Sequence, residues 1–272
     1  MMPTDPKPLG LIICMPTRGA ISIETESCTR EHLDGYPHRL LTVVGEPVVG
    51  ARNQLAREAR ELDATALDFD PQYVLWVDDD AWWPVGRVDR AVKALEENEW
   101  VTMVAGVYSK REPYSDAVAV TMETKTDGAG GKLYGYYFPL KYAPGELTKL
   151  RFTGAHWFLV RRDFLNLMGD EPFKRRTAFR ETLAGDKVAD PNTLASEDIS
   201  FCVRLREAGG TIVTECSLLI GHVDVTTGKV YFVNSPAQIA NRAEAPIYAK
   251  GYKQTPYDHR TYGEEHAALM QA

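Results

Sequence analysis

The sequence predicts a mixed α/β protein built on a doubly wound, mostly parallel central sheet. Between residues 9 and 107, apolar segments of strand length alternate with segments of helical character. This alternation is typical of parallel strands joined by crossover helices. One apolar segment, Tyr73–Val77, runs without a break into three aspartates. An unbroken apolar segment indicates a strand buried on both faces, as in the middle of a parallel sheet.

The elements of the first half follow from local patterns. Strands are expected at Leu9–Met15, His38–Val44, Tyr73–Val77 and Trp100–Val107, and helices at Ser22–Leu33, Ala51–Leu62 and Pro84–Asn98. Ser22 with Thr25 three residues later makes a weak cap for the first helix. The second helix is rich in good helix formers. The third has apolar residues at helical spacing, and Pro84 stands at its first turn.

The second half predicts a smaller antiparallel sheet. Alternating residues at 117–122 and aromatic residues at 132–138 flank a glycine-rich turn at 127–131, which together indicate a hairpin. Later patterns predict a strand at Leu150–Val160 interrupted at Gly154, a short helix at Arg161–Met168, a polar loop at Glu171–Asp190, a helix at Ser196–Ala208 that ends at Gly209-Gly210, and strands at Thr211–Thr214 and Ser217–His222. The pattern fades from Asp224 onward.

The composition is that of a soluble globular protein. Of the 272 residues, 44% are hydrophobic and 25% are charged, both ordinary values. No apolar run reaches the ~18 residues of a membrane helix, and Leu9–Met15 lacks the basic lead-in and cleavage site of a signal peptide. The net charge of −7 argues against broad binding to nucleic acid by charge alone.

The cysteines suggest a reducing compartment. They are Cys14, Cys28, Cys202 and Cys216. No pairwise spacing among them suits zinc or a redox pair, so we expect buried thiols and no disulfide. We therefore expect a cytoplasmic protein, in the host cytoplasm if a phage encodes it.

The three aspartates after Tyr73–Val77 are the strongest candidates for a functional site. In extended chain Asp78 and Asp80 point the same way and Asp79 points the opposite way. Two converging carboxylates repel each other unless a cation lies between them, and Mg²⁺ or Mn²⁺ prefers such oxygen ligands. The alternative is that these residues only end the strand and cap the helix at Pro84.

Two further polar segments lie where a ligand is expected. The loop Pro16-Thr17-Arg18 follows the first strand, and its arginine can pair with a phosphate or stack on a base. Arg52 and Asn53 are expected at a helix N-terminus, where backbone N–H groups and an arginine favour an anion. The alternative for each is an ordinary surface cation or cap.

A late helix opens with acidic residues. Ser196 is a good N-cap, and Glu197 and Asp198 in the first turn suit the helix dipole. That explanation is complete on structural grounds. A carboxylate at this place could also act as a general base within hydrogen-bond reach of an acceptor.

Taken in order, these four pieces resemble the GT-A glycosyltransferases, in particular the small family-2-like enzymes of bacteria and their phages. The pieces are the loop after strand one, Arg52-Asn53, the aspartate cluster and Glu197-Asp198. Each motif is short, but their order and spacing together are fairly specific. The resemblance covers about residues 9–222 and implies a GT-A domain with a nucleotide-binding half at 9–107 and an acceptor-side half at 108–222. Residues 223–272 are then an extension, a lid or a tail.

The resemblance implies a metal site and a nucleotide-sugar donor. The aspartates match the family's DXD motif, so that Asp78 lies near the ribose or a metal-bound water and Asp80 binds Mn²⁺ or Mg²⁺. His222, after an apolar run, matches a third metal ligand, with Asp224 as a reserve ligand or an orienting partner. The donor is a nucleotide-diphosphate sugar, and a UDP-sugar is the first choice.

Further roles are carried over from the same resemblance. Nucleotide-binding residues are Pro16, Thr17, Arg18, Arg52, Asn53 and Asp79. Asp198 is the base in an inverting enzyme, and Glu197 contacts the acceptor or the sugar; a retaining enzyme would use Asp198 differently. Acceptor- or sugar-binding residues are Gly154, Ala155, His156 and Trp157, with Gly154 allowing close approach and Trp157 offering a stacking face. At least one of Trp82 and Trp83 is expected in the core.

The acceptor hydroxyl belongs to a saccharide or, as a minority reading, to a hydroxymethylated DNA base. A local basic stretch would contact DNA if DNA is the acceptor, although a solvated face is the preferred explanation: Arg161, Arg162, Lys174, Arg175, Arg176 and Arg180. Two alternatives to a glycosyltransferase are a nucleotidyltransferase-like enzyme, although the first loop lacks its lysine, and a non-catalytic nucleotide-sugar-binding module. A P-loop ATPase is excluded because no GxxxxGK[ST] stretch occurs.

Overall fold

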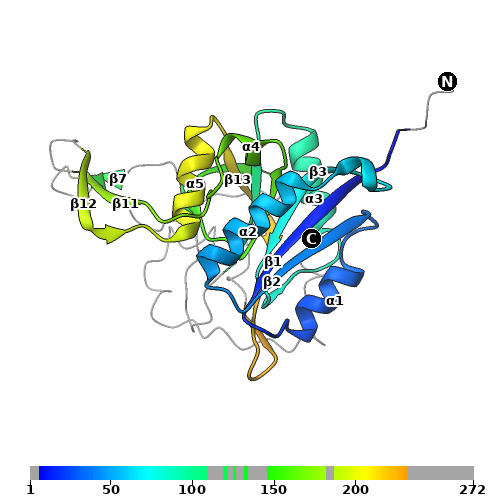
Figure 1. Cartoon of the computed structure of the whole chain (residues 1–272). Coiled ribbons are helices and arrows are strands. Elements are labelled where there is room, and N and C mark those ends of the chain that lie inside the picture. Colours follow the sequence, from blue (N-terminus) through cyan, green and yellow to red (C-terminus); the bar gives the residue numbers. More distant parts are fainter. Residues whose placement is uncertain are drawn as a thin grey trace.

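The computed structural model describes residues 6–108, 119–121, 125–126, 132–133, 146–181 and 187–231. Its body is an eight-stranded sheet with helices on both faces (Figure 1). The predicted mixed α/β class is confirmed. Among the described residues, no helix has both the length and the apolar character needed to cross a membrane.

The central sheet is mostly parallel. Its strands, in spatial order, are β2 (His38–Val44), β1 (Leu9–Thr17), β3 (Asp70–Val77), β10 (Trp157–Arg161), β5 (Met103–Val107), β13 (Ile212–Leu219), β9 (Leu147–Thr153) and β6 (Ala119–Thr121). β10 and β9 run against their neighbours, and the other six strands share one direction. Because β10 lies between β3 and β5, the two predicted halves of the chain share one sheet.

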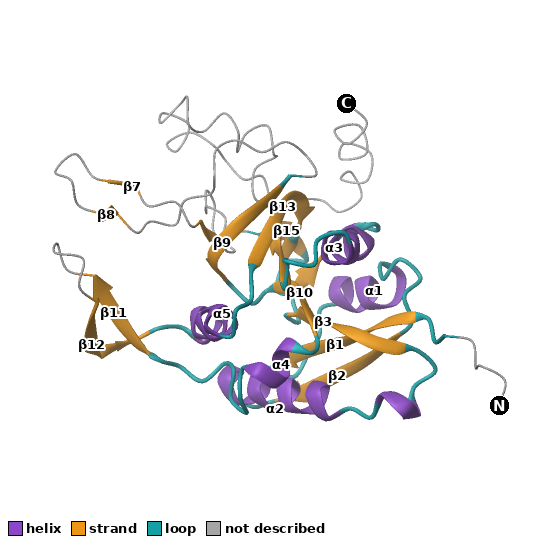
Figure 2. Cartoon of the chain, turned by 90° about the horizontal axis from the view of Figure 1, so that it is seen from above, coloured by secondary structure: helices purple, strands orange, loops and turns teal. Residues whose placement is uncertain are grey.

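Helices cover both faces of this sheet (Figure 2). One face carries α1 (Ile23–Glu31) and α3 (Arg87–Glu96), and the other carries α2 (Val48–Glu61), α4 (Phe164–Leu167) and α5 (Glu197–Glu207); a short 3₁₀ helix, η1, spans Ala64–Ala66. Each layer has its own buried apolar cluster, with Leu75 and Trp83 in the first and Trp76 and Phe158 in the second. Strand β3 is therefore buried on both faces, as its unbroken apolar character predicts.

A small antiparallel sheet lies at the edge where β3 ends. It consists of β4 (Ala81–Trp82), β14 (Gly221–Asp224) and β15 (Lys229–Tyr231), in the order β15-β14-β4. His222 pairs with Ala81 and Gly221 with Trp82. This pairing joins the segment after β3 to the segment after β13 and positions the site described below. The predicted smaller antiparallel sheet is confirmed, but it forms from these residues.

The predicted strand Leu150–Val160 is wrong. The chain forms two strands there, β9 and β10, and β5 and β13 lie between them in the sheet. The interruption at Gly154 is a full break in which residues 155–156 form a bend. A local pattern cannot distinguish a bulge from a change of course, because both use a glycine.

The predicted polar loop at Glu171–Asp190 is also wrong in part. Two paired strands, β11 (Thr177–Glu181) and β12 (Lys187–Leu194), form an arm that projects from the body (Figure 1, Figure 2). A two-stranded ribbon away from the core does not require apolar alternation, so the periodicity test misses it.

The predicted hairpin of 117–122 with 132–138 is replaced by other pairings. β6 joins the large sheet beside β9, and β7 (Lys125–Thr126) pairs with β8 (Lys132–Leu133). The turn at 127–131 lies outside the described residues, and so does nearly all of the predicted C-terminal lid or tail, from residue 232 onward.

Three helices start three residues away from the prediction, and one of them is α4, which begins at Phe164 because Arg161 still belongs to β10. α2 begins at Val48, three residues earlier than expected. α3 begins at Arg87 because Gly86 at the preceding position has a φ of 85°, which a glycine adopts readily. The Asp34 carboxylate accepts hydrogen bonds from the N–H groups of Gly86 (2.6 Å) and Asp89 (2.9 Å), and so caps this helix.

The predicted free thiols are confirmed for Cys14, Cys28 and Cys202, which are buried and form no disulfide. Burial raises the pKa of the Cys28 thiol to about 12, and that of Cys202 also to about 12. These thiols are therefore protonated packing groups.

We expect Gly106→Ala to destabilise the fold. A Cβ on Gly106 in β5 would lie 2.3 Å from Cγ1 of Ile220 and 3.1 Å from the Trp157 ring. Overpacking of this kind costs about 1–3 kcal/mol, measurable by urea unfolding. Gly50→Ala in α2 is the matched control, because its nearest atom lies at 3.9 Å; it should gain about 0.5–1 kcal/mol. Equal stability of Gly106→Ala and wild type would contradict the packing seen at β5.

Candidate functional site

Three segments meet at the carboxyl end of β3. Asp78, Asp79 and Asp80 follow that strand directly. His156 precedes β10, whose first residue, Trp157, pairs with Val77 at the end of β3. The third segment carries His222, which pairs with Ala81 in the small sheet. Open α/β sheets bind their ligands in the crevice beyond the carboxyl ends of their strands.

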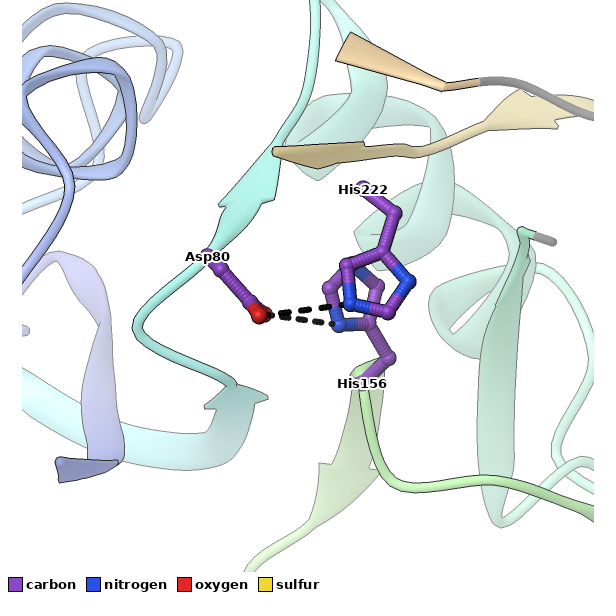
Figure 3. Close-up of side chains that lie close together, drawn as sticks. All are labelled: Asp80, His156 and His222. Carbon is purple, nitrogen blue, oxygen red and sulfur yellow. Dashed lines mark hydrogen bonds and ion pairs between the residues drawn. The ribbon is translucent and has the colours of Figure 1, made fainter. Parts of the chain in front are cut away.

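Asp80, His156 and His222 form a cluster with the geometry of a metal site. Their ligand atoms all lie within 4.8 Å of one another. Oδ2 of Asp80 is 3.3 Å from Nε2 of His222, and Oδ1 of Asp80 is 3.5 Å from Nδ1 of His156 (Figure 3). The imidazole ring centroids are 4.3 Å apart. One carboxylate and two imidazoles suit a divalent transition metal such as Mn²⁺.

The environment of His156 favours a cation. Its Nε2 lies 3.1 Å from the Gly221 carbonyl oxygen, which can only accept, so Nε2 carries the hydrogen. Nδ1 then faces carboxylate oxygens of Asp78 and Asp80, each at 3.5 Å. If Nδ1 carried a lone pair, the negative carboxylate oxygens would repel it. A proton on Nδ1 or a metal ion between these groups removes the repulsion. Burial works to lower the pKa of His156, but the two carboxylates outweigh it and raise the pKa.

Asp78 is tied to Arg52. Its Oδ1 accepts a 2.6 Å hydrogen bond from Nη2 of Arg52. Burial works to raise the pKa of Asp78, but the guanidinium and His156 outweigh it and hold the pKa well below its usual range. The pKa of Asp80 is likewise lowered, because His222 and His156 outweigh its burial. Both carboxylates are therefore ionised at neutral pH. Asp78 was predicted as a metal ligand; one of its oxygens binds Arg52, and His156 takes its place in the cluster.

Asp79 faces the loop after β1, as strand alternation predicts. Its Oδ2 accepts from the Arg18 N–H at 3.2 Å, and its carbonyl accepts from the Ser22 N–H at 2.9 Å and the Thr25 hydroxyl at 3.1 Å. Burial and the charges of the neighbouring aspartates raise its pKa. Asp79 thus holds the segment that was predicted to cradle a nucleotide.

That segment differs from the predicted loop, because β1 continues through Pro16 to Thr17. Arg18 and Gly19 follow it, and both residues are exposed. Beside them lies a groove of ≈ 460 Å³ between α1 and β2, which Thr17, Gly19 and Thr42 help to line. The groove is large enough to accept part of a small ligand.

Arg52 and Asn53 do not lie at a helix N-terminus. α2 begins at Val48, so both residues stand in its second turn. Nη1 of Arg52 donates to Oε1 of Glu197 at 2.9 Å, and Oδ1 of Asn53 accepts from the Phe173 N–H at 2.8 Å. The expected anion site at a helix N-terminus is therefore wrong, because the side chains of Arg52 and Asn53 form hydrogen bonds to other parts of the protein.

Glu197 and Asp198 open α5 beside this arginine. Glu197 contacts Arg52 and lies 3.7 Å from Arg175. Ser196 is the N-cap residue as predicted, but its hydroxyl donates to Asp198 instead of accepting from the helix. Oδ1 of Asp198 also accepts from the Ile199 N–H at 2.8 Å, which holds this carboxylate at the first turn of α5.

Trp157 does not offer a stacking face. Its side chain is fully buried, and its ring lies 6.4 Å from that of Trp83, which is also fully buried. The expectation of a sugar platform at Trp157 is corrected, whereas a core position for Trp83 is confirmed. Of the four predicted acceptor residues, His156 belongs to the metal cluster, and Gly154 and Ala155 form the break between β9 and β10.

Tyr108 is a site residue that sequence reasoning missed. It follows β5 at the same edge of the sheet, and its ring centroid lies 4.6 Å from that of His156 and 6.4 Å from that of His222. Burial, and then the charges of Asp198 and Asp78, raise its pKa well above the usual value. Its place at the end of a predicted strand is the signal that could have revealed it.

The predicted basic stretch is largely used inside the protein. Nε of Arg161 donates to the Val101 carbonyl, and Nε of Arg162 to the Ala59 carbonyl, both at 2.9 Å. Three others form ion pairs: Lys174 with Glu171, Arg175 with Glu197, and Arg176 with Glu207. Of Arg180, only the backbone is described. The prediction that Arg161 and Arg162 could contact DNA is therefore wrong, because their guanidinium groups bind backbone carbonyls.

Comparison with solved structures finds the same fold at low sequence identity. The chain is similar to the crystal structure of A197 from STIV, with a TM-score of 0.50 and 13% identity over 84% of this chain and 95% of that chain. No protein-family model matches the sequence, and neither does any curated protein.

Two weaker similarities have TM-scores below 0.5 and carry no argument. One is to GalNAc-T7 with UDP, GalNAc and Mn²⁺, with a TM-score of 0.43 and 10% identity over 76% of this chain and 42% of that chain. The other is to 4-diphosphocytidyl-2C-methyl-D-erythritol synthase from Anaerococcus prevotii DSM 20548, with a TM-score of 0.33 and 12% identity over 75% of this chain and 88% of that chain.

The raised pKa of His156 predicts a pH-dependent stability. Its protonation stabilises the metal-free fold fully below the unfolded pKa of about 6.5, and this contribution is lost as pH rises through the higher folded pKa. Thermal unfolding of the metal-free protein should therefore show a midpoint that falls as pH rises above about 6.5. The stabilisation by added Mn²⁺ should grow over the same range, because protons compete with the metal.

His156→Gln is the control for this pH dependence. Asp78 and Asp80, with lowered pKa values, lose their contributions only as pH falls below the ordinary carboxyl range, outside the tested window. A pH slope in His156→Gln equal to that of wild type would show that another group is responsible.

Proposed function

We propose that the chain is a metal-dependent glycosyltransferase that moves a sugar from a nucleotide-diphosphate sugar, a UDP-sugar first, to an acceptor hydroxyl. The observation that carries the proposal is the meeting of two groups of side chains at one sheet edge. Asp80, His156 and His222 form the cluster that could hold a metal ion. Beside it, Arg52 binds both Asp78 and Glu197, which lies at the start of α5. A donor diphosphate needs a divalent ion, which the first group could hold beside Asp78, and an acceptor hydroxyl needs a carboxylate such as those that open α5.

The donor side would lie between the metal cluster and β1. Asp80, His156 and His222 would hold Mn²⁺ or Mg²⁺, and a bound divalent ion neutralises the charge that develops on a nucleoside diphosphate leaving group. Two imidazoles favour Mn²⁺ over Mg²⁺. The nucleoside would take the groove beside Thr17 and Arg18, whose backbone Asp79 holds.

The acceptor side would lie at the first turn of α5. Asp198 is the proposed general base, because it follows Glu197, which Arg52 joins to Asp78, and a carboxylate can remove a proton from an attacking hydroxyl. This role applies if the enzyme inverts. Glu197 is the proposed acceptor contact, fixed by Arg52 at 2.9 Å.

A saccharide is the better acceptor candidate. DNA binding depends on arginines and lysines that are free to contact phosphates, and several cations of the basic stretch bind backbone carbonyls or acids instead. We assign catalysis to residues 9–222, with the donor bound mainly by residues 9–107. The buried free thiols support a reducing compartment such as the cytoplasm.

Asp80→Ala should abolish metal binding and donor cleavage. We expect Mn²⁺ affinity, measured by titration calorimetry, to fall more than about 100-fold, beyond the effect of changing an outer-shell group. Release of UDP from UDP-sugars in the presence of Mn²⁺ should be lost. Asp170→Ala is the control, because the Asp170 side chain is 82% exposed and pairs with Arg60, away from the site. Normal turnover by Asp80→Ala would refute the metal assignment. Metal-dependent donor binding by wild type with no turnover would indicate a binding module.

Asp198→Asn should separate binding from catalysis. The amide keeps the size of the side chain but cannot accept a proton, so kcat should fall about 10²–10⁴-fold while UDP affinity stays close to that of wild type. Glu207→Gln, at the other end of α5, is the matched control and should keep full activity. Undiminished transfer by Asp198→Asn would exclude this carboxylate as the base.

A further inference from the structure

Arg52 joins carboxylates from two distant segments of the chain. Its Nη2 lies 2.6 Å from Oδ1 of Asp78, which follows β3, and its Nη1 lies 2.9 Å from Oε1 of Glu197, the first residue of α5. The two nitrogens of one planar guanidinium thus bind one acid each. The separation of these two acids is set by the fork of the arginine, because both bonds come from one rigid group.

The surroundings of Arg52 leave the fork little freedom. The side chain is 5% exposed, and its guanidinium carbon lies 5.8 Å from the centre of the Phe173 ring. Asn53, the next residue in α2, accepts a hydrogen bond from the Phe173 N–H. The helix, the aromatic ring and the two acids therefore form one packed unit, and a shift of α5 would be opposed by the bonds to Arg52.

We propose that Arg52 is a positioning residue that holds the donor-side carboxylate Asp78 and the acceptor-side carboxylate Glu197 at the separation that transfer requires. The inference rests on the proposed function, because the two sides are named by it. Asp198 follows Glu197 in the same helical turn, so the fork also sets the place of the proposed base relative to the metal cluster. Arg52 itself touches no reacting atom.

Arg162 shows what a purely structural arginine looks like in this fold. Its Nε binds the carbonyl of Ala59, and its Nη2 binds those of Arg60 and Leu62, all at the end of α2. It stabilises the helix end and contacts no carboxylate of the site. Arg162→Lys is therefore a matched control for Arg52→Lys: both keep the charge and lose the planar fork.

The test is a double-mutant cycle of Arg52→Lys and Glu197→Gln, read by UDP release from a UDP-sugar with Mn²⁺. We expect Arg52→Lys to lower kcat about 100-fold, the scale of a small misplacement, with little change in KM and unchanged Mn²⁺ affinity. In the Glu197→Gln background the same change should cost little more, because the two residues act as a unit. Arg162→Lys should lower the Tm but leave kcat and Mn²⁺ affinity unchanged.

A second variant gives a readout that a loss of folding cannot imitate. Arg52→Gln removes a positive charge near the metal cluster, so Mn²⁺ alone should bind about tenfold more tightly, although catalysis falls. Three results would each overturn the proposal. They are a wild-type kcat in Arg52→Lys, reductions in kcat that simply multiply in the double mutant, and weaker Mn²⁺ binding by Arg52→Gln. If wild type cleaves no nucleotide-sugar, the proposed function fails by itself. The connection that Arg52 makes between the two acids is then tested by the Tm values of the same single and double mutants. Non-additive changes in Tm support it, and additive changes overturn it.

Discussion

Three carboxylates around one buried guanidinium, with a fourth beside them, determine how the site is built. Asp78, Asp80, Glu197 and Asp198 come from the ends of two elements that the fold brings together, and the charges of three of them act on Arg52. Ionised groups this close repel unless cations lie among them. Arg52 neutralises part of this charge, and the two imidazoles face the remainder. A site with an excess of oxygen anions is stabilised by whatever positive charge can enter it, and this imbalance is why we propose a divalent cation there.

The backbone holds the three metal-cluster residues before any ligand arrives. The Val223 N–H donates to the Asp80 carbonyl at 2.7 Å, which fixes the segment after β3 against β14, the strand that carries His222. The Asp78 N–H donates to the His156 carbonyl at 3.0 Å, which fixes the break before β10. Each ligand therefore sits next to a residue whose main chain is already paired. A site held in this way loses little conformational entropy when it binds an ion.

The parts that local pattern determines could be predicted, and the parts that depend on distant pairing could not. Strand β2 matches its prediction at both ends, and the burial of β3 follows from its unbroken apolar run. The aspartates and His222 were placed at the correct edge because a strand end is a local feature. The place of His156 beside Asp80 was not predicted, since this contact depends on β10 entering the sheet beside β3. The bonds of Arg52 to two distant acids likewise leave no trace in local sequence.

The reversed strand β10 explains how a second-half residue reaches the donor side. In a parallel strand the carboxyl end would lie at the active edge, and the chain would leave through a crossover helix. Because β10 runs antiparallel to β3 and β5, its beginning lies at that edge instead, and the residue before it, His156, projects among the aspartates. The strand then returns into the core, where Phe158 and Val160 are buried. The same strand packs in the core and, through the residue before it, brings an imidazole to the site. The positions of the three candidate metal ligands therefore depend on the packing of the sheet.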